Sequence, residues 1–581
     1  YKKIQKRLQK GWNTWNNNSV LQHVLLPQGF GLNLAFKEQS KLNDQFLTKS
    51  IIREEKNNPH KIILGGHSID GSYTELDLEL GEINLNIKTA HVGKDLVILI
   101  DPGALSKNKI KLVLETMLLW NKKGNLSRNQ AMLKAVLPGK IVKIFTTEKE
   151  AIEDPYVPTK SPYLCFWLNR KIGISTGIKR SIYQIESIIN LEKKKMQDRA
   201  NFYDDLSEIY SAIESSLGWS LVFEPKFHRA MSTSDRTNSE KIEGQYFLNW
   251  NNFFLCYLSG IMNQDIAYAN MIELFYNQEI ESSIIGNSQI DNMKHIEMPK
   301  IPVGSVLVKE IYKMHPNRWF LESCFEGLLD WNRWWPRNRI NNGLLSYSQS
   351  DIIKYKISNT DWNDNSIYFF SIYNDVNYSR ETRSFVLQDV GLNSLYIADC
   401  VALLEIAKIL NRKEEALELE SRIKYFKREM EGLWSKYHGA YLNYNTESDT
   451  LSKRIPMTIF LPLLAQLGDS KQKESILNKF YNEKFNFNEE EVWPEINFLT
   501  YLSFRKSGFL KEARDLSYKS NQLLKSGLNQ EEYMIVNSFN YSNTLDLDSF
   551  LSKKYSFKIA LLGVMEFIER DLIPKPESLI K

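Results

Sequence analysis

The chain has few cysteines, few histidines, little net charge and no long apolar run. Of 581 residues, 4 are cysteine and 8 histidine, and 74 Lys and Arg nearly balance 70 Asp and Glu. A formal net charge of +4 over this length does not indicate a nucleic-acid binder. The longest apolar windows, residues 458–465 and 559–565, are far shorter than the ~20 residues that cross a bilayer. We therefore expect no nucleic-acid partner and no membrane span.

The four cysteines, Cys165, Cys256, Cys324 and Cys400, are far apart in the sequence, and each lies in an apolar or aromatic stretch. No CxxC pair and no Cys/His spacing typical of a metal site accompanies them. This pattern predicts buried thiols rather than disulfides, and it gives no reason to expect a metal.

The common nucleotide and zinc motifs are also missing. The sequence contains no GxGxxG, no GxxxxGK[ST] and no HExxH. One GxSxG occurs at residues 173–177, but the alternating strands and helices of an α/β-hydrolase do not surround it, so we interpret it as a chance match. We therefore expect neither nucleotide chemistry nor zinc hydrolysis, and no cofactor.

The first third of the chain has the short alternating segments of an antiparallel sheet. Residues 73–80 and 83–88 alternate apolar with polar side chains on either side of a short break, which predicts a hairpin. Residues 95–100 and 140–145 are further strand candidates. The pattern predicts an antiparallel β-sandwich over residues 1–175.

The rest of the chain has helical patterns. Residues 176–217 contain a charged stretch with few turn residues, which we interpret as a helical linker. Residues 394–410 are apolar nearly all round, as in an enclosed helix, whereas residues 416–433 carry a single apolar stripe. The same pairing of inner and outer helix recurs at residues 496–524. Stacked helical hairpins of this kind predict a solenoid or a toroid over residues 218–581.

Four segments of the helical part concentrate Trp, Asn, Asp and Glu outside any amphipathic pattern: residues 247–254, 331–337, 360–366 and 530–533. Aromatic rings stack on the C–H faces of sugars, while amides and carboxylates bind their hydroxyls. Structural roles are the alternative, namely helix packing for the tryptophans, turns for the Asn-rich runs and a solvated helix face for the glutamates.

Short motifs along nearly the whole chain resemble those of the α-glycosidases around glycoside hydrolase family 63, in particular its smaller bacterial members and the mannosylglycerate hydrolases. The matching segments, in chain order, are 11–15 (GWNTW), 24–30 (VLLPQGF), 70–74 (DGSYT), 248–254 (LNWNNFF), 266–271 (IAYANM), 364–366 (DNS), 389–396 (DVGLNSLY), 492–498 (VWPEINF) and 531–533 (EEY). Each motif is short, but their common order makes coincidence a poor explanation.

The resemblance implies a mainly α fold, with an (α/α)6 toroid catalytic domain over residues 218–581 behind the β-sandwich and linker. It also implies inverting hydrolysis of a terminal α-linked hexose, glucose or a close epimer, from an oligosaccharide or small glycoside, without a metal or other cofactor. Asp364 would be the general acid and Glu531 the general base. The residues implied to bind the substrate are Trp250, Asn251, Trp362, Asn365, Trp493 and Tyr533.

The sequence departs from the family pattern at several positions near the sugar pocket. Asn251 replaces an Asp, Ile367 replaces a Pro, and residues 487–491 stand where a Tyr-Trp-Arg-Gly is usual. We expect altered specificity rather than lost catalysis. Asp361 competes with Asp364 for the role of acid, and Glu532 with Glu531 for that of base.

Two other functions stay open at this point. One is a catalytically inactive carbohydrate-binding relative. The other is a polysaccharide lyase on the same toroid, which would need a cationic cluster for a uronic acid, and Arg333, Arg337 and Arg339 are the densest candidates. If a leader was removed before Tyr1, a periplasmic or exported location is favoured.

Overall fold

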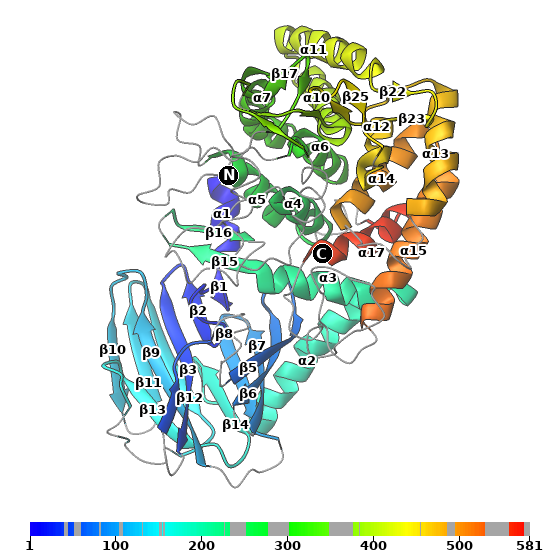
Figure 1. Ribbon diagram of the computed structural model, residues 1–581. Helices are drawn as coiled ribbons and strands as arrows, with labels where there is room; N and C mark the ends of the chain where they lie inside the picture. Colours follow the sequence, from blue (N-terminus) through cyan, green and yellow to red (C-terminus); the bar gives the residue numbers. More distant parts are fainter. Residues whose placement is uncertain are drawn as a thin grey trace. The chain divides into compact units, whose positions relative to one another are not determined.

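The computed structural model of the chain forms two compact units, which are described separately. One comprises described residues up to 232, and the other comprises described residues 251–527 and 557–573 (Figure 1). The described residues are 1–39, 44–50, 60–80, 83–103, 109–129, 132–149, 154, 157–225, 227–232, 251–276, 301–347, 376–382, 384–453, 455–484, 494–528 and 557–573.

The first unit contains two antiparallel sheets. The first sheet has the order β1-β2-β3-β9-β13, with β4 also paired to β3. Its strands are β1 (Gly11–Asn13), β2 (Gln22–Leu26), β3 (Phe30–Gln39), β4 (Asp44–Leu47), β9 (Lys109–Leu118) and β13 (Tyr163–Trp167). The second sheet has the order β10-β11-β12-β14-β8-β7-β6-β5. Its strands are β5 (His60–His67), β6 (Tyr73–Leu80), β7 (Ile83–Val92), β8 (Asp95–Asp101), β10 (Asn125–Asn129), β11 (Met132–Leu137), β12 (Lys140–Thr146) and β14 (Ile172–Thr176).

Alternating side chains fill the space between these sheets. Leu76 and Leu78 of β6 join Leu32 and Leu34 of β3 in one buried apolar cluster, as expected where the inner faces of two sheets meet. The predicted strands and the β6–β7 hairpin are confirmed. Residues 173–176 of the GxSxG match lie inside β14 rather than in a strand-to-helix turn, which agrees with a chance match.

Helix α2 (Ile182–Asn201) covers the outer face of the second sheet. Ile185, Ile189 and Met196 pack on Tyr73 and Leu99. The stretch predicted as one linker helix is in fact two, because the chain turns through η1 (Asp204–Leu206) before α3 (Ser207–Ser220). The remaining elements of this unit are α1 (Lys2–Leu8), β15 (Leu221–Glu224) and β16 (Arg229–Ser232).

The second unit consists of paired helices. The inner helices are α4 (Asn251–Met262), α6 (Gly304–Met314), α10 (Val390–Leu410), α12 (Leu461–Leu464, continuing η3, Met457–Phe460), α14 (Pro494–Ser507) and α17 (Phe557–Glu569). The outer helices are α5 (Gln264–Tyr276), α7 (Arg318–Arg339), α11 (Lys413–Glu431), α13 (Ser470–Lys484) and α15 (Leu510–Leu528). Short strand pairs connect some of them: β17 (Ile340–Asn341), β18 (Leu344–Leu345), β19 (Tyr378–Ser379), β20 (Ser384–Phe385), β21 (Leu387–Gln388), β22 (Trp434–Ser435), β23 (Ala440–Tyr441), β24 (Tyr444–Asn445) and β25 (Thr450–Leu451).

The inner helices form a closed ring within the described part of this unit. In order, α4 packs on α6, α6 on α10, α10 on α12, α12 on α14, α14 on α17, and α17 on α4 again (Figure 1). Between successive inner helices the chain passes through an outer helix, so the inner helices all run in the same direction. The predicted fold class is therefore confirmed. It is mainly α, with an N-terminal antiparallel β-sandwich followed along the chain by a helical toroid.

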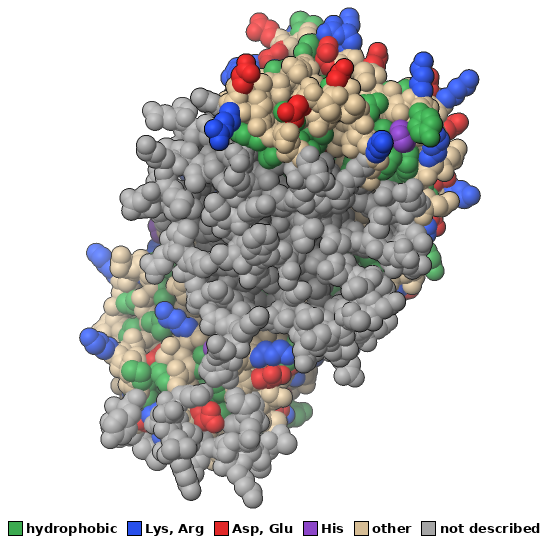
Figure 2. Space-filling view, viewed as in Figure 1, with side chains coloured by type: hydrophobic (Ala, Val, Ile, Leu, Met, Phe, Trp, Pro, Cys, Tyr) green, Lys and Arg blue, Asp and Glu red, His purple; other side chains and the backbone are tan. Residues whose placement is uncertain are grey.

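Burial separates the two kinds of helix as the sequence pattern predicts. In α10, 16 buried residues are distributed over all sides of the helix. In α11, by contrast, the buried residues Leu419, Phe426 and Met430 lie along one stripe. Figure 2 shows acidic and basic side chains interspersed on the outer face near α11. At the start of α6, a Cβ on Gly304 would lie 2.7 Å from the Trp331 ring, so glycine permits the close packing of α6 on α7.

A buried carboxylate joins three of these helices. Asp399 of α10 accepts the backbone N–H of Ser305 at the start of α6 (2.7 Å) and the amide of Asn332 on α7 (3.0 Å). The Asn332 amide is fixed in turn, because its oxygen accepts a hydrogen bond from Arg422 of α11 (2.5 Å). Burial raises the pKa of Asp399 from 3.8 to about 6, although these hydrogen bonds favour the charged form.

The pKa of Asp399 predicts a pH-dependent contribution to stability. Because its pKa is higher in the folded chain than in the unfolded chain, this contribution is complete below pH 4 and is lost as the pH rises through about 6. We expect the difference in unfolding free energy between the wild type and Asp399→Asn to fall by about 2 kcal/mol from pH 4.5 to pH 7. Urea unfolding at both pH values measures it. Asp330→Asn, an exposed change on α7, is the control, and a difference that does not change with pH would refute this assignment.

Candidate active site

The two ends of the helical ring differ in how the chain connects them. At the C-terminal ends of the inner helices the connections to the outer helices are short: one residue between α4 and α5, and two between α10 and α11 and between α14 and α15. The returns from outer to inner helices are long, for instance from Arg339 of α7 to Val390 of α10. The chain therefore enters every inner helix at one common end of the ring, called here the entry end.

Every predicted site residue belongs to a segment that leads into an inner helix at the entry end. Asn251 is the first residue of α4, and Trp493 directly precedes Pro494, the first residue of α14. Asp364 falls between α7 and α10, and Glu531 between α15 and α17. The side chain of Asn251 and all atoms of the other predicted site residues lie outside the described residues, namely Trp250, Trp362, Asp364, Asn365, Trp493, Glu531 and Tyr533.

The described residues on either side of the segment that contains Asp364 are held close together. Tyr347, before it, accepts a hydrogen bond from the backbone of Phe385 (2.9 Å), and Asn377, after it, accepts one from Val386 (3.0 Å). Because Phe385 and Val386 are adjacent in the chain, the segment leaves and returns at neighbouring points. This anchors both ends of the predicted acid's segment beside the start of α10.

The start of α10 is fixed by the side chains of the DVGLNSLY motif. Asp389 caps the helix, because its carboxylate accepts the backbone N–H of Leu392 (3.0 Å). The amide of Asn393 exchanges two hydrogen bonds with the backbone of Leu345 (2.8 and 3.0 Å). Farther along, the Tyr396 hydroxyl donates to the carbonyl of Asn332 (3.0 Å). These motif residues therefore fix the start of α10 and the chain that packs against it.

Helix α14 places two buried polar side chains near the entry end. Glu495 and Asn497, 1% and 0% exposed, follow Pro494 in the first two turns. Neither polar atom of the Asn497 amide has a hydrogen-bond partner among the described residues. A buried, unpartnered amide is uncommon and indicates a group that can bind a ligand or water. Sequence reasoning did not select Asn497, and its only signal was a polar residue within an apolar inner helix.

The tryptophans of the segment at residues 331–337 pack in the protein interior and do not form a sugar-binding site. Trp331 and Trp335 of α7 are fully buried, and Trp331 stacks on Phe253 of α4 with 5.5 Å between ring centres. Arg333 donates hydrogen bonds to both carboxylate oxygens of Glu418 on α11. The guanidinium group of Arg333 already binds this carboxylate. Arg333 therefore does not contribute to the uronate-binding cluster that a lyase would need.

Three further predictions from the sequence concern the cysteines, metal binding and membrane spans. All four cysteines are buried and form no disulfide, as predicted. In the part of the chain that the structure describes, no group of three or more His, Cys, Asp or Glu side chains could hold a metal ion. Among the same residues, α10 is long and apolar enough to cross a membrane by length and composition, but 83% of its most apolar window is buried inside the protein. Such burial is expected of a core helix.

Comparison with known proteins identifies the chemistry of the helical unit. Residues 248–488 match the sequence model of the mannosylglycerate hydrolase MGH1-like glycoside hydrolase domain. Over these residues the chain is similar to a glycoside hydrolase domain. The matched range begins just before α4 and ends just after α13, so it includes Asp364, whereas Glu531 lies beyond it. The enzyme class predicted from the sequence is confirmed, and a carbohydrate is its substrate.

Several solved structures are similar to this chain at low identity. The GH63 mannosylglycerate hydrolase from Thermus thermophilus, in complex with Tris, has 15% identity and a TM-score of 0.43, covering 58% of this chain and 95% of that one. Neutral trehalase Nth1 from Saccharomyces cerevisiae has 11% identity and a TM-score of 0.42, covering 60% and 76%. A GH78 family rhamnosidase of Bacillus sp. GL1 has 11% identity and a TM-score of 0.46, covering 84% and 47%. No curated protein sequence matches the chain.

Proposed function

We propose that the chain is an inverting, exo-acting α-glycosidase that releases a terminal α-linked hexose, glucose or a close epimer. The main support is the closed ring of inner helices, because every segment that carries a predicted site residue leads into the ring at its entry end. The glycoside hydrolase domain match over residues 248–488 gives the reaction class. The proposed domains are the β-sandwich at 1–175, the linker at 176–217 and the catalytic toroid at 218–581.

In this mechanism two carboxyl groups act on opposite faces of the sugar. Asp364 donates its proton to the glycosidic oxygen as the bond from that oxygen to the anomeric carbon breaks. Glu531 takes a proton from a water molecule whose oxygen forms the new bond to the anomeric carbon. A separation of ~6.5–9.5 Å between the carboxyl groups leaves room for that water.

This mechanism requires one ionised and one protonated carboxyl group. The N-termini of the inner helices carry partial positive charge, which stabilises an ionised carboxylate such as the base, Glu531. The acid must instead keep its proton near neutral pH, and we propose that Trp362 and neighbouring aromatic rings raise the pKa of Asp364 by excluding water. Trp250, Asn251, Asn365, Trp493 and Tyr533 then line the subsite for the terminal sugar.

The substrate is an oligosaccharide or a small α-glycoside. The name of the matching domain makes mannosylglycerate one compound to include, together with α-glucosyl and other α-mannosyl glycosides. Asn251 stands where the family has Asp, so one hydrogen-bond acceptor of the sugar pocket becomes an amide that both donates and accepts. We expect this change to shift the preferred sugar rather than to abolish hydrolysis.

The anomeric form of the first product tests the proposal. An inverting enzyme releases the β-anomer from an α-glycoside, and proton NMR during the first minutes of hydrolysis distinguishes it from the α-anomer before mutarotation mixes them. We expect the β-anomer from at least one compound of the panel. The α-anomer as first product would refute inversion, and binding without hydrolysis across the panel would favour the inactive carbohydrate-binding relative.

A further inference from the structure

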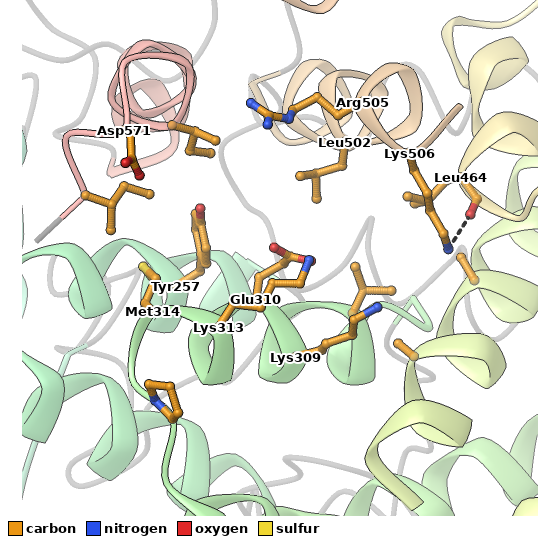
Figure 3. A pocket seen from close by; sticks show the side chains of 16 residues that line it. Tyr257, Lys309, Glu310, Lys313, Met314, Leu464, Leu502, Arg505, Lys506 and Asp571 are labelled. Carbon is orange, nitrogen blue, oxygen red and sulfur yellow. Dashed lines mark hydrogen bonds and ion pairs between the residues drawn. The ribbon is translucent and has the colours of Figure 1, made fainter. Parts of the chain in front are cut away.

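A cavity lies within the ring, toward the C-terminal ends of most inner helices and away from the entry end. It has a volume of about 870 Å³, within the range of small-molecule sites, and every inner helix or the residues just after it contribute to its walls (Figure 3). Tyr257 of α4, Glu310 of α6 and Lys506 of α14 lie on it, at or beyond the middle of their helices. The proposed hydrolysis uses none of these residues.

Most cations of this cavity already have a carboxylate partner. Lys309 pairs with Glu405, Lys313 with Glu310 at 2.7 Å, and Arg505 with Glu569 at 2.7 Å. Positive side chains near helix C-termini also interact favourably with the partial negative charge there. These three residues therefore have a sufficient structural role.

Lys506 differs from the other cations of the cavity. Its ammonium donates one hydrogen bond to the carbonyl of Leu464 (3.0 Å), and it forms no ion pair within the described part of the chain (Figure 3). Its surroundings lower the pKa of Lys506 to about 8, mainly through burial and then through the nearby positive charge of Lys309. An ammonium has three N–H donors, so two remain for an anion in the cavity.

Tyr257 provides a second hydrogen-bond donor to the cavity. Its side chain is 2% exposed, and Figure 3 shows its hydroxyl pointing into the cavity. No described residue accepts a hydrogen bond from this hydroxyl. Burial raises the pKa of Tyr257 well above its usual range, so the hydroxyl keeps its proton and remains a donor. A ligand oxygen in the cavity can therefore accept a hydrogen bond from this hydroxyl.

We propose that this cavity binds a small aliphatic carboxylate that also carries a hydroxyl group. The carboxylate binds the ammonium of Lys506, and the ligand hydroxyl accepts a hydrogen bond from Tyr257. Val306, Leu464, Leu502 and Ile568 also line the cavity and give it aliphatic walls that suit the carbon chain. Because Lys506 is a single cation and the carboxylates of Glu310 and Asp571 also line the cavity, a monoanion fits better than a phosphate dianion.

Binding to the full chain tests this site by calorimetry and thermal unfolding. The probes are ω-hydroxy carboxylates of four to eight carbons, the matching carboxylates without the hydroxyl, and the matching diols. A ligand that binds only the folded chain raises Tm with concentration. We expect the hydroxy acid of best-fitting length to bind most tightly.

Two variants test the contact with Lys506 and the contact with Tyr257 separately. Lys506→Met should weaken binding of the hydroxy acid at least tenfold and leave binding of the diol unchanged. Tyr257→Phe should remove the preference for the hydroxy acid over the simple carboxylate. Lys519→Met, which removes an ammonium paired with Asp515 on α15, should bind like the wild type.

The proposal would be overturned if no carboxylate of the panel bound the wild type. It would also be overturned if Lys506→Met and Tyr257→Phe both bound the hydroxy acid as the wild type does. Neither readout involves hydrolysis, so the result is independent of the proposed glycosidase activity.

Discussion

Replacing Asp364 by Asn, or Glu531 by Gln, is expected to lower kcat on the best α-glycoside by about 10³-fold while leaving the fold intact. Each change keeps the size of the side chain and removes one proton transfer, and positioned acids and bases contribute roughly 10²–10⁴-fold each. The sugar should still bind, because neither substitution removes a ring or an amide of the proposed subsite. Steady-state kinetics, together with calorimetric sugar binding, measures both effects.

The neighbouring carboxylates provide matched controls. Asp361→Asn and Glu532→Gln carry the same chemical change a few residues or one residue away, and they should keep near-normal rates. An α-glycosyl fluoride separates the two roles further, since fluoride leaves without protonation. Asp364→Asn should hydrolyse this substrate and Glu531→Gln should not. Near-normal rates in both main variants would contradict the assignment.

Replacing Asp154 by Asn is expected to destabilise the sandwich by about 3–5 kcal/mol, because it removes the buried carboxylate that bridges two buried ammonium groups. Lys37 of β3 and Lys111 of β9 stand directly opposite each other on neighbouring strands. The Asp154 carboxylate lies 3.1 Å from the Lys37 ammonium and 2.8 Å from that of Lys111, and all three side chains are at least 90% buried. Like charges directly opposite in a sheet are destabilising, so the strand register itself requires this carboxylate.

Urea unfolding followed by tryptophan fluorescence tests this prediction. Glu322→Gln removes an exposed ion pair with Arg318 and should change stability by no more than about 1 kcal/mol. Adding Lys37→Met and Lys111→Met to Asp154→Asn should recover most of the lost stability, since apolar side chains can replace a buried ion cluster. A loss below about 1 kcal/mol in Asp154→Asn alone would contradict the account.

Local sequence patterns were sufficient for many elements of the fold. The alternation in residues 73–80 follows from one face of β6 packing in the sandwich core while the other faces outward. The single stripe of α11 and the all-round apolar α10 likewise reflect how many sides of each helix the protein covers. Each pattern depends on the immediate neighbours of one element, which is why the sequence predicts it.

Features that depend on distant residues could not be predicted in this way. The contact between α17 and α4 that closes the ring joins the two ends of the helical unit. The cap that Asp399 provides for α6 and the shared carboxylate of Asp154 also connect groups far apart in the chain. The spacing of residues along the sequence does not indicate which distant residues will be in contact.

The candidate site was predicted through motif order rather than through geometry. Residues such as Asp389 and Asn393 carry part of the resemblance, yet their contacts hold the backbone at the start of α10. Trp334 and Trp335 are buried packing residues, which is the structural alternative that the sequence left open, whereas the unpartnered amide of Asn497 emerged only from the structure. The roles of Asp364 and Glu531 remain predictions.

A crystal structure of the Glu531→Gln variant with an intact α-glycoside tests the central claim most directly. The distance to measure joins the carboxyl group of Asp364 to the amide that replaces the Glu531 carboxylate. The account predicts about 6.5–9.5 Å between them at the entry end, with a water held between residue 531 and the anomeric carbon. A separation near ~5 Å, as in retaining enzymes, or positions at different ends of the ring, would contradict it.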